Sequence, residues 1–167
     1  MSDLIKLEKI VTSLKVKDLQ YSAIKDLKEV LVNNPTIARD AYEKIIPILE
    51  TDEDRWLRIA RIGIQALNEV LHCDPSLTKD IYDHVIPFLQ WCSNDATVSA
   101  LYILTDIVIY EQSFANEELL KKTQSFVTDD DVDVTGSANY LAGLINGILI
   151  TKRRKYKKEI VKKLKGE

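Results

Sequence analysis

Two stretches of the chain, residues 23–50 (AIKDLKEVLVNNPTIARDAYEKIIPILE) and residues 63–90 (GIQALNEVLHCDPSLTKDIYDHVIPFLQ), align without a gap at a shift of 40 residues. Helix interiors tolerate few prolines, so prolines at one repeated spacing are hard to obtain by chance. A period of this length is typical of stacked helical hairpins. The 4 prolines of the chain fall into the alignment as two matched pairs, Pro35 with Pro75 and Pro47 with Pro87.

The repeated prolines also predict where helices begin and bend. Asn34-Pro35 and Asp74-Pro75 each open a helix, because Asn or Asp caps a helix and proline suits its first position. We expect kinks at the second proline of each copy, near the helix end. Apolar residues at helical spacing predict helices over 2–13, 17–33, 36–50, 55–72, 76–91, 96–112, 116–127, 134–151 and 153–165.

These elements predict one all-α domain spanning residues 1–167. Consecutive helices would pair into about four hairpins, and a basic helix would cap the last of them. The predicted hairpins cover residues 2–33, 36–73, 76–112 and 116–151, and the capping helix covers 153–165.

Residues 45–60 (IIPILETDEDRWLRIA) resemble a HEAT repeat: a first helix with a proline, an acidic turn, and a second helix with an early Arg and an Ala. Residues 85–100 resemble it again but lack the Arg, and the segment 116–151 lacks the proline. The resemblance covers about 36–112. It implies an armadillo-type, right-handed α-solenoid of eight or nine helices, with the second helices forming the binding ridge. Such arrays serve as scaffolds, adaptors, transport factors and occasionally nucleic-acid enzymes, so the partner stays open.

The face of helix 55–72 opposite its apolar stripe predicts the residues of this ridge. The equivalent residues 40 positions earlier lie on helix 17–33, and those 40 positions later lie on helix 96–112. Those 80 positions later lie on helix 134–151. We predict that the ridge binds another protein as an acidic or amphipathic peptide or helix. The alternative is a solvated face at one end and ordinary core at the other. The candidate contacts are Lys25, Lys28, Arg58, Arg61, Leu101, Leu141 and Ile145.

Helix 134–151 is apolar nearly all round, so several of its sides must be covered. The first alternative is that two neighbouring helices pack over it, namely 116–127 and 153–165. A homodimer through helix 134–151 is the other, and Gly143 and Gly147 would let a neighbouring helix approach closely.

Charge is unevenly spread along the chain. The net charge is −3, yet residues 151–167 carry nine basic and two acidic residues, which leaves an acidic body. We predict that the basic helix caps the last hairpin and keeps its charged side in solvent. The alternatives are that this side contacts phosphates or faces a membrane surface. Lys152, Arg153, Arg154 and Lys155 are the candidate nucleic-acid contacts. The alternative function is therefore a nucleic-acid-binding or DNA-repair protein like the HEAT-like alkyl-base glycosylases, which the acidic body disfavours.

Residue patterns for catalysis and metal binding are weak. Asp129, Asp131 and Asp133 alternate as in a calcium loop, but Val134 stands where such a loop needs glycine. His72 and His84 lie twelve residues apart without zinc-ligand spacing. No phosphate-binding glycine loop or nucleophile elbow is present. We therefore expect no enzyme, cofactor or metal.

The cysteines and the apolar runs bear on location. Cys73 and Cys92 have no C-x-x-C spacing, as expected of reduced thiols. The first residues carry no signal-peptide pattern, and the longest apolar run, near residues 141–150, is short of the ~20 residues that span a bilayer. We expect a cytoplasmic protein with no membrane partner.

Overall fold

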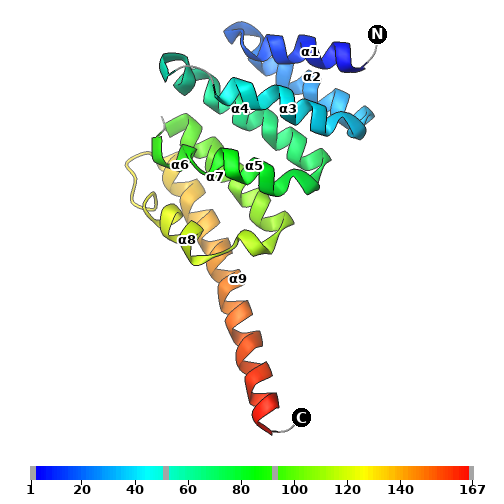
Figure 1. Ribbon diagram of the computed structural model, residues 1–167. Helices are drawn as coiled ribbons and strands as arrows, with labels where there is room; N and C mark the ends of the chain where they lie inside the picture. The colour runs from blue at the N-terminus through cyan, green and yellow to red at the C-terminus, as the bar shows by residue number, and fades with distance from the viewer. Residues whose placement is uncertain (1–2, 51–52, 92–93, 166–167) are drawn as a thin grey trace.

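In the computed structural model the described residues form helices joined by turns, and no strand occurs among them (Figure 1). The backbone is described over residues 3–50, 53–91 and 94–165, and the side chains over the same residues except 53–59, 90–91, 161 and 163–165. The prediction of an all-α chain is confirmed. The α-helices are α1 (Asp3–Leu14), α2 (Gln20–Asn33), α3 (Ala38–Leu49), α4 (Glu53–Cys73), α5 (Thr78–Val85), α6 (Phe88–Trp91), α7 (Asn94–Tyr110), α8 (Glu117–Gln124) and α9 (Val132–Lys165).

The Asn-Pro and Asp-Pro dipeptides start helices, as predicted. Each proline opens a short 3-10 turn that leads directly into α3 or α5. The carboxylate of Asp74 accepts the backbone N–H of Ser76, whereas the side-chain oxygen of Asn34 accepts the hydroxyl of Thr36. The second prolines act differently: Pro47 lies within α3, but the chain leaves the helix at Pro87, which separates α5 from α6.

Consecutive helices pack as pairs, and the second helix of each pair packs against the next (Figure 1). The pairs are α1 with α2, α3 with α4, α5 and α6 with α7, and α8 with α9. Contacts then run from α2 to α4, from α4 to α7 and from α7 to α9. Each of these helices therefore has neighbours on two or three sides.

One continuous apolar cluster fills the space between these helices. Helix α7 lies in the middle of the packing and is the most deeply enclosed, with Leu101, Ile103, Leu104 and Val108 fully buried. Helices α3 and α4 approach closely at Gly63, where an added Cβ would lie 2.4 Å from Cδ2 of Leu49. The glycine therefore sets the spacing of this pair.

The C-terminal end of the chain differs from the prediction. Residues 132–165 form one helix of 34 residues, α9, instead of a hairpin helix followed by a separate capping helix 153–165. No proline or glycine occurs between Gly147 and Lys165 to end the helix, so it continues. The basic half extends away from the other helices (Figure 1), and residues 150–160 are exposed. It does not cover helix 134–151.

Candidate functional site

The outward sides of α2, α4 and α7 form one surface, which we call the second-helix face. Its residues recur every three or four positions along each helix, as one exposed side of a helix requires. The face consists of Tyr21, Lys25 and Lys28 on α2, Arg61, Gln65, Asn68 and His72 on α4, and Val98, Tyr102, Asp106, Ile109 and Tyr110 on α7.

Arg61 ties the three helices together at one end of the face. Its Nη2 donates to the hydroxyl of Tyr21 at 3.0 Å, and its Nη1 lies 3.1 Å from Oδ2 of Asp95 at the start of α7. Lys28 and Glu69 make a second link between α2 and α4 at 3.5 Å. Exposed pairs of this kind contribute little stability, but they define which side chains of the face contact one another across the helices.

His72 connects α4 to α7 at the other end of the face. Its Nδ1 lies 2.8 Å from the hydroxyl of Tyr110, and its Nε2 lies 3.2 Å from Nδ2 of Asn68 and 3.5 Å from Oδ2 of Asp106. With Asn68 donating to Nε2, the neutral ring carries its proton on Nδ1 and donates to Tyr110. Oδ1 of Asn68 is buried and accepts no hydrogen bond from the residues described.

Large apolar and aromatic side chains stand exposed across the same face. Tyr21 is 75% exposed, Tyr102 62% and Ile109 53%. Tyrosine and arginine are enriched at the centres of protein interfaces, where a large side chain binds with little loss of conformational freedom. The face therefore combines interface residue types with internal links that orient them.

Three predicted contacts lie on the second-helix face, and one lies outside the described side chains. Lys25 and Lys28 are exposed on α2, and Arg61 is half-buried between Tyr21 and Asp95. Arg58 belongs to α4, but its side chain is outside the part of the structure that is described.

The other three predicted contacts, Leu101, Leu141 and Ile145, are core residues. Each is 0% exposed, so placing them on a surface ridge was wrong. For Leu101 the cause is one extra residue in the second acidic turn: seven positions separate Pro47 from Asp54, but eight separate Pro87 from Asp95. After that turn the shift is 41 rather than 40.

Correcting the shift turns the predicted stripe by one residue on α7. The exposed Tyr102 then replaces Leu101. On α9 the exposed positions Gly143 and Gly147 lie two residues beyond the predicted Leu141 and Ile145. The sequence carried this signal, because Asp54 aligns with Asp95 only at the longer shift.

The predicted nucleic-acid contacts lie where α9 leaves the packed helices. Lys152, Arg153, Arg154 and Lys155 are all exposed. The Nζ of Lys152 donates to the backbone oxygen of Gln112 at 2.7 Å, and Arg153 pairs with Glu117 of α8. Two of the four cations are therefore engaged within the chain.

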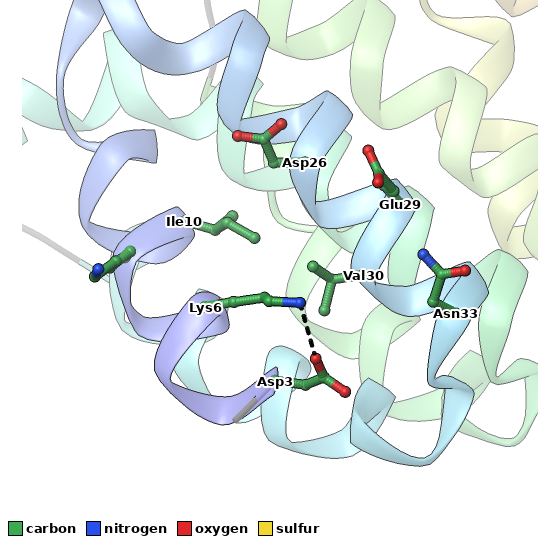
Figure 2. Close-up of a pocket in the computed structure, with 8 residues that line it drawn as sticks. Asp3, Lys6, Ile10, Asp26, Glu29, Val30 and Asn33 are labelled. Atoms are coloured by element: carbon green, nitrogen blue, oxygen red, sulfur yellow. Dashed lines mark ion pairs between the residues drawn. The ribbon is translucent and has the colours of Figure 1, made fainter. Parts of the chain in front are cut away.

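A groove of 330 Å³ lies between α1 and α2, away from the second-helix face (Figure 2). Ile10 and Val30 lie among charged side chains there, and Nζ of Lys6 approaches Oδ1 of Asp3 at 3.4 Å. The pKa of Asp3 is lowered, first by the hydrogen bond from Asn34 and then by Lys6. The lining mixes both charge signs: Asp3, Lys6, Lys9, Ile10, Asp26, Glu29, Val30 and Asn33.

The Asp129–Asp133 turn uses its carboxylates to start α9. Oδ1 of Asp131 accepts the backbone N–H groups of Asp133 at 2.9 Å and Val134 at 3.2 Å, and Nδ2 of Asn94 donates to Oδ2 at 2.9 Å. These hydrogen bonds, with Asn94 first, lower the pKa of Asp131 below 3.8. Within the described residues, no three His, Cys, Asp or Glu side chains gather as metal ligands.

No family model, curated protein or solved structure matches this chain. Across the described part of the chain, no helix has both the length and the apolar character needed to cross a bilayer.

Proposed function

We propose that the chain is a non-catalytic scaffold that binds another protein along its second-helix face. The helices would form a short right-handed solenoid of about four HEAT-like hairpins. The packing order supports this, because each hairpin contacts its neighbours in sequence and the second helices follow one another as α2, α4, α7 and α9. We place this function in the cytoplasm, on the spacing of the two cysteines.

The observation that carries the proposal is the pre-oriented, aromatic-rich second-helix face. Tyr21, Arg61 and Asp95 form a chain of contacts across three helices, and Tyr102 lies exposed on α7. Groups held in place before binding lose less conformational freedom when a partner arrives, which favours affinity.

A binding role suits the distribution of polar groups better than catalysis does. The polar side chains of the face spread over three helices, whereas small-molecule sites bring polar groups together in an enclosed apolar pocket. The groove between α1 and α2 lies elsewhere and carries exposed charges of both signs.

Affinity capture with matched variants tests the proposal. Tyr102→Glu adds a negative charge to the face, and Gln124→Glu adds the same charge to an exposed position on α8. We expect wild type and Gln124→Glu to retain the same partner from a lysate of the native cells, and Tyr102→Glu to lose it. Equal capture by all three proteins would refute binding at this face.

The projecting half of α9 supports nucleic acid as a second candidate partner. Residues 151–160 are exposed and include six cations, four of which lie beyond Arg153. Clustered Lys and Arg bind phosphates with an affinity that falls steeply as salt rises. Titration of a generic duplex at low and moderate salt, with wild type and with Lys157→Ala/Lys158→Ala, tests this. Binding that is absent at low salt excludes the candidate.

A further inference from the structure

Helix α9 presents an outward stripe that no other described helix covers. The stripe, which we call the α9 stripe, follows the exposed side of the helix through positions three or four apart. Its members are Gly136, Tyr140, Gly143, Gly147 and Ile150. Figure 1 shows that α9 has α7 and α8 beside its first half and no helix beside its second half.

The three glycines of the α9 stripe have no packing role inside the chain. A Cβ added at Gly136, Gly143 or Gly147 would meet no atom within 4 Å. Glycine is the least favourable helix residue after proline, so its repeated use on one side of a helix needs a reason. Close approach of another backbone is such a reason, and no such backbone lies there among the described residues.

Charge changes sign from one end of α9 to the other. Asp129, Asp130 and Asp133 are exposed at the start, and the cations of residues 152–158 are exposed in the second half. Two copies of α9 running in parallel would place like charges together. An antiparallel pair would place each basic half against the partner's acidic start.

The positions of the α9 stripe fit an antiparallel pair. With Gly143 of one copy against Gly147 of the other, Tyr140 faces Ile150, and Gly136 faces Arg154. The same alignment brings Asp133 next to Lys158, on the same flank of the two helices. Every contact occurs twice, as the two-fold symmetry of a homodimer requires.

We infer that a second copy of this chain docks along α9, antiparallel, with Gly143 and Gly147 at the centre of the contact. The stripe and the basic half of the helix supply a contact about 33 Å long from Gly136 to Lys158. This interaction is separate from partner binding at the second-helix face, and either stands without the other.

Sedimentation equilibrium of the full chain at low salt tests the inference. We expect a monomer–dimer equilibrium with a dissociation constant below about 100 μM. Gly143→Glu should weaken it about tenfold or more, because the new side chain fills the space that the partner backbone needs. Gln124→Glu adds the same charge on α8 and should leave it unchanged. A monomer at all concentrations, or an equal dimer with Gly143→Glu, overturns the inference.

Charge reversal distinguishes the antiparallel arrangement from any other dimer. Asp133→Lys or Lys158→Asp alone should weaken the dimer several-fold, and the two together in one chain should restore it. Failure of the double variant to recover would contradict this alignment. A monomeric chain that binds a generic duplex through residues 152–158 would assign the basic half to phosphate binding, and would also overturn the inference.

Discussion

At the scale of single residues, the exposure of Tyr102 and the burial of its neighbour Leu101 decide which surface is available for binding. The two positions are separated by about 100° around α7. The shift of 40 residues placed Leu101 outside, because the alignment was carried through a turn that holds one more residue. Periodicity predicts the apolar side of each helix, but the extra residue in the second acidic turn rotates the assignment on α7.

A pair of glutamate substitutions tests this register directly. Tyr102→Glu should change the free energy of unfolding by less than about 0.5 kcal/mol, since the side chain points to solvent. Leu101→Glu should cost more than about 3 kcal/mol or prevent folding, because it buries a charge within the core. Urea unfolding followed by circular dichroism measures both. The opposite ranking would show that the assignment of sides on α7 is wrong.

Asp131 provides a pH-dependent test at the start of α9. Its pKa is lowered in the folded chain, so its charged form adds stability above its unfolded pKa, and this contribution is lost as the pH falls through the folded value. Asp131→Asn keeps an accepting oxygen but no charge. We expect the variant to be less stable at pH 7, and the difference to shrink once the pH falls below 3.8 and vanish at lower pH.

Urea unfolding of wild type and Asp131→Asn over a series of pH values gives this difference. A gap that stays constant into the acidic range would mean that the charge of Asp131 contributes nothing to the start of α9.

At the scale of elements, the helix starts at Asn34-Pro35 and Asp74-Pro75 were predictable because capping and proline geometry are local. The continuity of α9 was not predicted, although no glycine or proline occurs between Gly147 and Lys165 to end the helix. The change from an apolar to a basic composition near residue 151 predicts a boundary that the structure does not have. Composition changes the surroundings of a helix without ending it.

Alanine at two helix-interior glycines should shift stability in opposite directions. Gly63→Ala forces Leu49 to move at the contact of α3 with α4, and we expect a loss of about 1 kcal/mol after the gain in helix propensity. Gly136→Ala meets open space and should gain about 0.5–1 kcal/mol. Thermal unfolding at one low protein concentration compares them. Equal effects would contradict the close approach at Gly63.

At the scale of the whole molecule, the chain divides into an enclosed helical body and a basic helix that leaves it. Lys152 and Arg153 contact the body through Gln112 and Glu117, and both are exposed. Removal of residues 152–167 should therefore lower the unfolding free energy of the body by less than about 1 kcal/mol. Loss of cooperative unfolding in the shortened chain would show that the helix supports the body after all.

The sequence also indicated much of the overall organisation, and for a physical reason. Hairpins that bury their apolar sides only against neighbours repeat the same local signals, so helix order and pairing follow from one repeat. The partner does not follow, because exposed residues face no packing constraint that would leave a pattern. The candidate face became visible once burial separated Tyr102, Ile109 and Tyr21 from the core.

The most direct test of protein binding at the second-helix face is site-specific photo-crosslinking in native cells. A photoreactive aromatic residue replaces Tyr102 in one protein and Gln124 on α8 in the other. A partner bound along the face predicts one adduct of defined mass, with another protein, from position 102 and none of that mass from position 124. The same adduct from both positions, or no protein adduct from position 102, would contradict binding at this face.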